Sequence, residues 1–261
     1  MSSSQANTAT TDLFAAARSY DQSINWDARL GREIPVIREV LGDPGDGGVV
    51  DAGCGTGHQA LALAQAGYNV VGADMSEQML AIARDRAASD EEDRIQFVQT
   101  PYAALREKVG PDHDGLYCLG NALAAAGTRE AVVEAIGQFG QCLRSGGKLF
   151  VQILNFKPMC EEVPCVRGPR VSRSDGIEYV SVREFHRDGE RLQVTNISLW
   201  HEDNGWCKRV NSGYLYPIMP EEMRTLLEEN QFVVHHFWGG YDRLPFEVST
   251  SVDLIVVATR R

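Results

Sequence analysis

The chain has 261 residues, of which 43% are hydrophobic and 23% are charged, and this composition is typical of a globular protein with a sizeable core. Its formal net charge of −11 argues against binding to nucleic acid, because that binding depends on Lys and Arg neutralising phosphates. The six cysteines include no Cys-x-x-Cys pair and no His partner at zinc spacing, and no apolar run is long enough for a membrane span. We therefore expect a cytoplasmic protein without a metal site, which binds neither nucleic acid nor membranes.

The N-terminal region predicts a helical cap. Residues 1–11, rich in Ser, Thr and Ala, are expected to form a loose tail, and apolar residues at three- and four-residue spacing predict two helices over residues 12–41. The joint between the helices, residues 20–29, carries two aromatic side chains and an arginine, which is more chemistry than a plain connector needs. A glycine- and aspartate-rich break at residues 42–48 precedes the first strand.

The most informative segment is Val-Val-Asp-Ala-Gly-Cys-Gly-Thr-Gly at residues 49–57. Its first residues predict the end of a buried strand, and its glycines allow a sharp turn into a helix over residues 58–66. A second strand, residues 68–73, ends at Asp74, and Ser76 is placed to cap the following helix. A strand, a glycine turn and a helix in this order form the ligand-binding corner of a doubly wound α/β domain.

Strands and helices continue to alternate up to residue 154, with three further strands at residues 95–98, 115–119 and 149–154. Residues 157–175 are expected to be irregular, and their three arginines (Arg167, Arg170 and Arg173) are interpreted as part of a solvated loop. Two-residue alternation and strong hairpin turns then predict three antiparallel strands. The chain ends with a helix that starts at Pro220 and two further strands. The three antiparallel strands are expected at residues 177–186, 192–200 and 206–216, and the last two strands at residues 232–238 and 252–258.

The predicted fold class is therefore α/β, with a doubly wound, mostly parallel seven-stranded sheet and an inserted three-stranded antiparallel sheet. Residues 12–156 and 217–261 are expected to form the α/β domain with its N-terminal helical cap. Residues 157–216 are expected to form the inserted sheet, which covers the substrate site.

The glycine spacing narrows the choice of ligand. Asp74 lies 17 residues after the third glycine, where an acid can accept hydrogen bonds from ribose hydroxyls. A dinucleotide site, however, needs its third glycine three residues after the second, and here Gly57 comes one position early. Asp51, just before the glycines, would also repel a pyrophosphate and would suit a ligand with an ammonium group. A nicotinamide-dependent reductase is therefore disfavoured.

Residues 51–57 resemble the first motif of the class I S-adenosylmethionine-dependent methyltransferases, an acid followed by Gly-x-Gly-x-Gly. The resemblance covers nearly the whole α/β domain, including a seven-stranded order with the last strand reversed. It implies S-adenosylmethionine as cofactor and S-adenosylhomocysteine as product. It also implies that the backbone of Gly53 to Gly55 approaches the methionine part, that Asp74 holds the ribose and that Met75 packs on adenine.

A closer similarity is to glycine N-methyltransferase and its small-molecule relatives. It is carried by Cys118-Leu-Gly-Asn121, by Tyr216-Pro217, by the Arg29 joint, and by Tyr102 at the position of an adenine-stacking aromatic. By this analogy Arg29 pairs with the cofactor carboxylate and Leu119 lines the methionine region. The cofactor-binding residues implied are Trp26, Arg29, Asp51, Ala52, Gly53, Cys54, Gly55, Asp74, Met75, Met79, Tyr102 and Leu119.

Two departures disfavour glycine as the methyl acceptor. Those relatives have an arginine just after the fifth strand that holds the glycine carboxylate, whereas this chain has Leu-Asn-Phe at residues 154–156. A histidine expected shortly after Asn121 is replaced by alanines at residues 124–126.

Methyl transfer from a sulfonium is an in-line displacement, in which positioning of donor and acceptor supplies much of the acceleration. An amine acceptor needs little acid–base machinery, whereas an oxygen or carbon acceptor favours a nearby base, and no catalytic residue is assigned. We expect a methyltransferase that acts on a small molecule at an amine or a hydroxyl; the alternative is a regulatory module that binds the cofactor without transferring its methyl group. A homo-oligomer is left open. The candidate acceptor-binding residues are Tyr20, Asn121, Asn155, Tyr216 and Tyr241, with Trp26 also facing this pocket.

Overall fold

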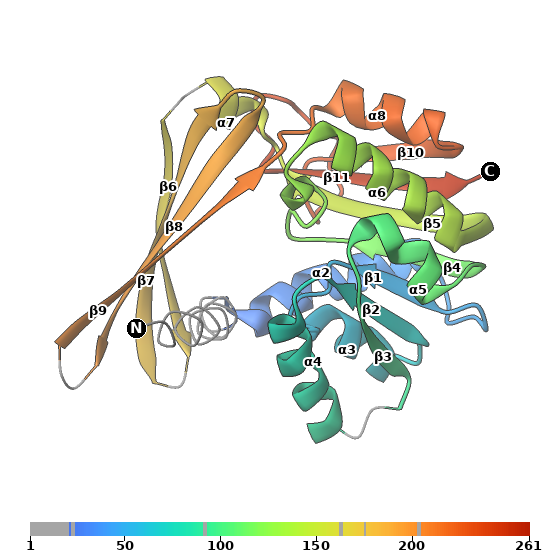
Figure 1. Ribbon diagram of the computed structural model, residues 1–261, viewed down its shortest axis with the longest axis horizontal. Coiled ribbons are helices and arrows are strands. Elements are labelled where there is room, and N and C mark those ends of the chain that lie inside the picture. The colour runs from blue at the N-terminus through green and yellow to red at the C-terminus, as the bar shows by residue number, and fades with distance from the viewer. Residues whose placement is uncertain (1–20, 22–23, 91–92, 162–163, 175, 203–204) are drawn as a thin grey trace, which may run out of the picture.

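The computed structural model describes residues 21, 24–90, 93–161, 164–174, 176–202 and 205–261. The expected tail at residues 1–11, the first expected helix and Tyr20 lie outside these residues. Figure 1 shows two parts, a layered α/β domain and an antiparallel sheet that projects from one side of it.

The α/β domain is built on a seven-stranded sheet in the order β10-β11-β5-β4-β1-β2-β3. β11 is antiparallel to both of its neighbours, and β1 to β5 run parallel. This confirms the predicted doubly wound fold, including the reversed last strand. The strands are β1 (Val49–Ala52), β2 (Val70–Asp74), β3 (Ile95–Gln99), β4 (His113–Cys118), β5 (Leu143–Leu154), β10 (Phe232–Trp238) and β11 (Asp253–Arg260).

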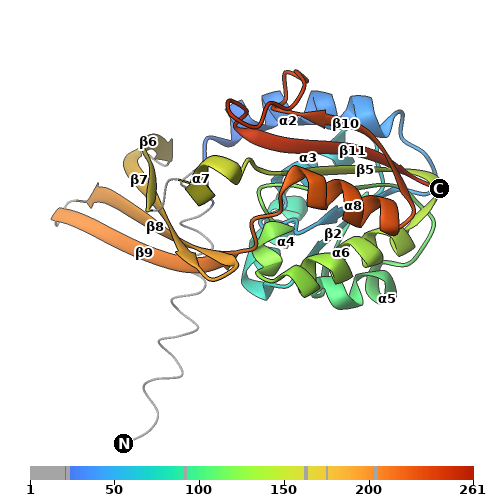
Figure 2. The ribbon, with the colours of Figure 1, turned by 90° about the horizontal axis from the view of Figure 1, so that it is seen from above.

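Helices cover both faces of this sheet (Figure 2). α2 and α3 pack on one face, α5, α6 and α8 pack on the other, and α4 packs against β2 and β3 at the edge. The helices are α2 (Trp26–Leu41), α3 (His58–Gln65), α4 (Glu77–Ser89), α5 (Leu105–Val109), α6 (Arg129–Cys142), α7 (Lys157–Glu161) and α8 (Pro220–Glu229), with short 3₁₀ turns at Tyr102–Ala104 and Ala124–Ala126.

Capping side chains determine where two of these helices begin. Ser76 accepts a hydrogen bond from the backbone N–H of Met79 and caps α4, as expected. Asn25 accepts one from Ala28 and starts α2 at Trp26. Trp26 and Arg29 therefore lie on the first turns of a helix rather than in an irregular joint, and their side chains are held at fixed positions along its axis.

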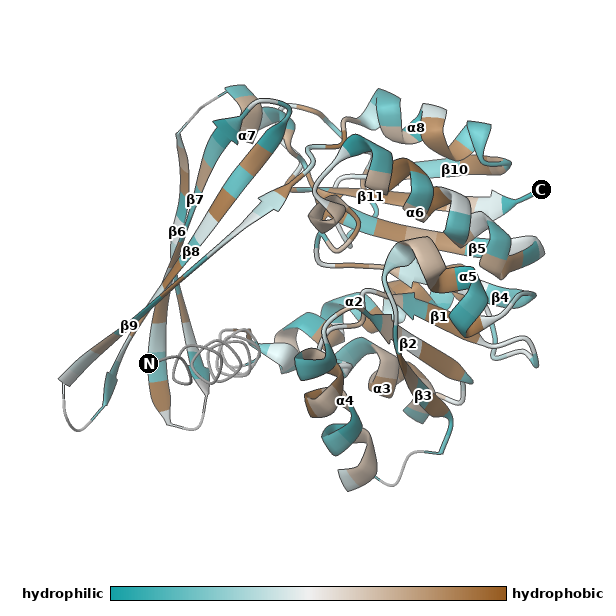
Figure 3. Cartoon of the chain, in the orientation of Figure 1, coloured by the Kyte–Doolittle hydropathy of each residue, from teal (hydrophilic) through white to brown (hydrophobic). Residues whose placement is uncertain are grey.

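Two apolar clusters, one on each face of the seven-stranded sheet, form the core. The larger contains Phe139 of α6 and Ile153 of β5, and the smaller contains Ile37 of α2 and Phe150 of β5. Figure 3 shows the hydrophobic colouring concentrated on the central strands of this sheet, while the projecting sheet is banded.

The projecting sheet has four strands, one more than predicted, in the order β6-β7-β8-β9. The additional strand, β6, occupies part of the segment expected to be irregular. It is an edge strand, and an extra residue at Gly168–Pro169 shifts its register against β7. This irregularity removes the two-residue alternation by which a strand is recognised. The strands are β6 (Cys165–Ser174), β7 (Ile177–Asp188), β8 (Arg191–Glu202) and β9 (Gly205–Leu215).

Candidate functional site

The glycine turn after β1 is shaped so that its backbone is accessible from the carboxyl edge of the sheet. Gly53 has a φ of 84°, and a Cβ added there would lie 2.5 Å from the Cβ of Ala122 and 2.7 Å from the hydroxyl of Tyr102. Gly55, with a φ of 55°, instead faces open space, with nothing within 4 Å of an added Cβ. The turn thus packs tightly underneath and leaves room for a ligand above.

Two adjoining hollows meet at Gly53. The larger, about 420 Å³, is lined by Asp74, Met75 and Tyr102 among others, and the smaller recess includes Trp26 and Arg29. Every residue expected to bind the cofactor lines one of them, except two. Ala52 is fully buried behind the turn, and Met79 lies on α4 away from the lining. The remaining members of the expected set, in the smaller recess, are Asp51, Cys54, Gly55 and Leu119.

Asp74, at the end of β2, is anchored by the backbone. Its two carboxylate oxygens accept hydrogen bonds from the N–H of Gly55 at 2.9 Å and from that of Ser76 at 2.8 Å. A carboxylate has lone pairs for further donors, and Asp74 lines the larger hollow. It is therefore placed to accept further hydrogen bonds from hydroxyl groups of a ligand in this hollow.

Asp51, the last acid before the glycines, is buried, with 3% of its surface exposed. Burial raises the pKa of its carboxyl to about 8, and the charge of Asp74 adds to this effect, while Tyr117 and Arg29 oppose it. A neighbouring cation would favour the ionised form. An ammonium group in the smaller recess fits this carboxyl, and a phosphate does not.

Arg29 is held in place by two residues that the sequence analysis did not identify. Its Nε donates to Glu33 at 2.8 Å, and the other oxygen of Glu33 accepts a hydrogen bond from the side chain of Gln59 at 2.9 Å. Glu33 is buried, and it lies one helical turn after Arg29. The spacing of four residues was a signal for this ion pair, but burial of the carboxylate could not be read from the sequence.

A second network joins Asp21 to the end of the glycine turn. Asp21 accepts hydrogen bonds from the hydroxyl of Thr56 at 2.6 Å and from Arg86 at 2.9 Å, and one of its oxygens lies 2.8 Å from Nε2 of His58. Although burial alone would raise it, the hydrogen bonds from His58 and Thr56 and the charge of Arg86 lower the pKa of Asp21. The ring of His58 stacks on Trp26 with the ring centroids 3.7 Å apart, so His58 has a structural role.

The ends of β4 and β5 are fixed to each other by side chains. Asn121, with a φ of 69°, accepts a hydrogen bond from the N–H of Leu154 at 2.6 Å. Gln152 accepts one from the N–H of Gly120 at 2.7 Å and donates one to Asp253 at 2.8 Å. These bonds set the wall between the smaller recess, which Gly120 lines, and the space beyond Leu154.

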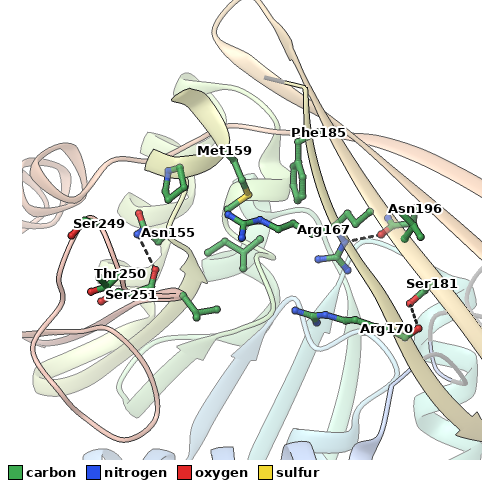
Figure 4. Close-up of a pocket in the computed structure, with 15 residues that line it drawn as sticks. Asn155, Met159, Arg167, Arg170, Ser181, Phe185, Asn196, Ser249, Thr250 and Ser251 are labelled. Atoms are coloured by element: carbon green, nitrogen blue, oxygen red, sulfur yellow. Dashed lines mark hydrogen bonds between the residues drawn. The ribbon is translucent and has the colours of Figure 1, made fainter. Parts of the chain in front are cut away.

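That space is a cavity of about 350 Å³ between the carboxyl end of β5 and the four-stranded sheet (Figure 4). We refer to it as the inter-sheet cavity. On the side of the α/β domain it is lined by Leu154, Asn155, Pro158, Met159, Ser249, Thr250, Ser251 and Val252, and on the side of the four-stranded sheet by Arg167, Arg170, Ser181, Val182, Arg183, Phe185 and Asn196.

Of the expected acceptor-binding residues, Asn155 lines the inter-sheet cavity and Asn121 stands directly behind Leu154. Asn155 donates to the backbone oxygens of Val248 and Ser251, each at 2.9 Å, and so holds the opposite loop. The three arginines of the lining had no role in the acceptor pocket expected from the sequence.

The two expected tyrosines that the structure describes lie elsewhere. Tyr216 donates from its hydroxyl to Glu222 at 3.0 Å, and burial together with Glu222 raises the pKa of that phenol to about 12. Tyr241 is packed in the smaller core cluster, with its ring 6.2 Å from that of Phe150 and the guanidinium of Arg32 over it. Neither tyrosine lines the three hollows.

No group of His, Cys, Asp and Glu side chains among the described residues has the arrangement of a metal site. None of the helices described has the length and apolar character needed to span a membrane.

The chain is similar to known methyltransferases. Residues 49–147 match the family model described as a methyltransferase domain. The glycine/sarcosine N-methyltransferase of Parasynechococcus marenigrum is 28% identical over 224 residues, covering 86% of this chain and 76% of that protein. That of Aphanothece halophytica is 27% identical over 216 residues, covering 82% and 76%.

Solved structures share the fold over nearly the whole chain. DesVI of Streptomyces venezuelae superposes with a TM-score of 0.73 at 18% identity and covers 98% of both chains. The S-adenosylmethionine-bound amino pentose methyltransferase CalS10 of Micromonospora echinaspora gives 0.70 at 21% identity, with 95% of both chains covered.

Proposed function

We propose that the chain, which is a class I S-adenosylmethionine-dependent methyltransferase acting on a small molecule, transfers the methyl group to an amine nitrogen. The observation that carries the proposal is the lining of the inter-sheet cavity, which among the described residues includes no His, Asp or Glu. A hydroxyl or carbon acceptor would favour such a base, whereas an amine that binds in its neutral form brings its own lone pair.

The residues around the glycine turn fit S-adenosylmethionine. Gly55 leaves open space above the backbone, and burial raises the pKa of the Asp51 carboxyl to about 8, so that a bound cation beside it would favour its ionised form. Asp51 would hold the ammonium end and Asp74 the ribose hydroxyls. Arg29 would face the carboxylate, with Glu33 fixing its orientation. When bound, the cofactor supplies an electrophilic methyl group on its sulfonium.

Other residues of the chain would position the acceptor and exclude water from it. The bonds from Asn121 and Gln152 hold the ends of β4 and β5, so that the wall between recess and cavity stays rigid. An amine in the inter-sheet cavity would be held on the side of Leu154, next to this wall. Apolar Leu154, Met159 and Phe185 would exclude water from the attacking lone pair. Positioning of this kind supplies much of the rate acceleration in a displacement reaction.

A relative that methylates an oxygen suggests the second candidate function. The ubiquinone biosynthesis O-methyltransferase of Leptothrix cholodnii is 26% identical over 171 residues, covering 64% of this chain. A hydroxyl acceptor therefore remains the alternative, and the lining of the inter-sheet cavity favours the amine. A regulatory module without transferase activity has no feature of the described site in its favour.

The test is formation of S-adenosylhomocysteine from S-adenosylmethionine with a panel of primary and secondary amines and a matched panel of alcohols and phenols. We expect turnover with members of the amine panel above the rate measured without acceptor. Turnover confined to alcohols or phenols would contradict the proposal, and no acceptor-dependent turnover in either panel, with S-adenosylhomocysteine bound in calorimetry, would favour the regulatory alternative.

A further inference from the structure

An extra residue in β6 brings two arginines to the same face of the four-stranded sheet. Arg167 pairs with Arg183 of β7, and Arg170 pairs with Ser181, so three steps along β6 correspond to two steps along β7. In a regular strand, residues three apart point to opposite faces. The bulge at Gly168–Pro169 cancels this alternation, and both arginines point toward the α/β domain.

Arg173, three residues after Arg170, lies on the opposite face of the sheet, as residues three apart do in a regular strand. It pairs with Glu178 across β6 and β7, and its guanidinium forms an ion pair with that carboxylate at 2.8 Å. Because the strand is regular between Arg170 and Arg173, these two side chains lie on opposite faces. Arg173 is therefore outside the inter-sheet cavity, although it shares the strand and the spacing.

The guanidinium groups of Arg167 and Arg170 extend from β6 into the inter-sheet cavity (Figure 4). In the part of the chain that the structure describes, neither forms an ion pair. Arg183, directly beside Arg167 on the neighbouring strand, is oriented by a hydrogen bond of its Nε to Asn196 at 2.8 Å. None of the described residues of the lining is a carboxylate, and Arg167 and Arg170 bring two positive charges to this wall in a chain whose net charge is −11.

The opposite wall adds neutral donors. The side chains of Ser249, Thr250 and Ser251 line the cavity on the loop before β11, and Asn155 holds this loop through two backbone oxygens. Arginine donates pairs of parallel hydrogen bonds that match the oxygens of a carboxylate or phosphate, and such charge-assisted bonds are among the strong ones in proteins. The volume of about 350 Å³ also exceeds what an acceptor as small as glycine would fill.

We propose that the inter-sheet cavity binds an oxyanion group of the methyl acceptor, a carboxylate or a phosphate, through Arg167 and Arg170. Arg183 and the serine and threonine hydroxyls opposite complete the site. The acceptor is then a bifunctional molecule with an amine at one end and an oxyanion at the other. This inference rests on the proposed function in one respect, namely that the cavity receives the acceptor.

Calorimetry with the protein saturated in S-adenosylhomocysteine tests the site without knowledge of the natural acceptor. The probes are malonate and pyrophosphate, and the proteins are the wild type, R167Q, R170Q and the matched control R173Q. We expect at least one probe to bind the wild type and R173Q equally. Each of R167Q and R170Q should weaken that binding by about tenfold or more, because each removes hydrogen bonds to a charged group. Binding of malonate alone assigns a carboxylate site, and binding of pyrophosphate alone assigns a phosphate site.

The same variants then report on turnover. In a panel of amines that each carry a carboxylate or phosphate, compared with their neutral amides or esters, R167Q and R170Q should raise KM for the anionic members by a larger factor than for the neutral members. R173Q should change KM for neither group. Unaltered affinity for S-adenosylhomocysteine in each variant confirms that it is folded.

The outcomes separate the two proposals. If neither probe binds the wild type, or if R167Q and R170Q bind as the wild type does, the oxyanion site is wrong, even where neutral amines are methylated. If the probes bind in an arginine-dependent way but no amine is methylated, the oxyanion site stands and the amine acceptor is wrong.

Discussion

Cofactor binding should depend on pH through the carboxyl of Asp51. Its pKa of about 8 means that at pH 7 only about one molecule in eleven carries the carboxylate in the free protein. A ligand whose ammonium group requires the ionised form binds with an affinity reduced by that fraction, a loss of about 1.4 kcal/mol at pH 7. The affinity for S-adenosylhomocysteine should therefore rise about fiftyfold from pH 6 to pH 8 and less than twofold from pH 8 to pH 9.

The protonated and ionised forms of the Asp51 carboxyl affect folding stability and ligand binding in opposite directions. The raised pKa stabilises the fold at low pH, and this contribution is lost as the pH rises from about 4 through 8, whereas ligand binding gains over the upper part of the same range. Calorimetry of S-adenosylhomocysteine between pH 6 and 9 measures the affinity. Titration at pH 7 in two buffers of different ionisation enthalpy should reveal the release of nearly one proton.

The variant Asp51→Asn separates this effect from titration of the ligand itself. It should bind S-adenosylhomocysteine more weakly above pH 8 and should lose the dependence on pH between 6 and 8. An affinity of the wild type that is flat over this range would refute the reasoning, as would the same pH dependence in Asp51→Asn.

Three further changes test the site. Asp74→Ala should weaken binding of S-adenosylhomocysteine by about 1.5–3 kcal/mol, the range for hydrogen bonds to a charged group. Gly53→Ala should lower the free energy of unfolding by about 2–4 kcal/mol in urea titration, because its Cβ would clash with Ala122 and its φ is positive. Glu33→Gln should weaken cofactor binding measured by calorimetry by about tenfold, since Arg29 loses the charge that orients it.

Each of these has an outcome that would contradict it. Unchanged affinity in Asp74→Ala would move the ribose elsewhere, and Glu77→Gln, which removes an exposed carboxylate from the next helix, is its matched control. Wild-type stability in Gly53→Ala would mean that the turn can shift enough for the added Cβ to avoid Ala122. Equal affinity in Glu33→Gln and the wild type would show that Arg29 is oriented without its ion pair.

The α/β fold was predictable because its signals are local. The glycine turn, the cap at Ser76 and the apolar strands each follow from a few neighbouring residues, and the right-handed crossovers then determine the strand order. β6 was missed because the bulge at Gly168–Pro169 interrupts the pattern on an edge strand that is largely polar. The start of α2 was placed too late for a similar reason, since Trp26 and Arg29 stand before the apolar periodicity begins.

The lining of the two hollows at Gly53 was more predictable than the lining of the inter-sheet cavity. The residues around Gly53 and Asp74 are fixed by the motif and by the ends of adjacent strands. The charge of the inter-sheet cavity wall depends on which face of β6 each arginine occupies. The one extra residue between Arg167 and Arg170 puts both on the same face, where a regular strand would put them on opposite faces. Tyr241 was expected in the acceptor pocket, but its ring packs in the smaller core cluster, and this packing could not be predicted from the neighbouring residues in the sequence.

The bulge in β6 also makes the charge of the inter-sheet cavity depend on chain length. Deleting one residue at Gly168–Pro169 would restore regular alternation, and one of Arg167 and Arg170 would then leave the cavity without any change of side chain. A single insertion or deletion in this edge strand would therefore change how many arginines face the acceptor, and with it the preference for an anionic acceptor. Relatives that differ in length here should be compared for substrate choice before those that differ only by substitution.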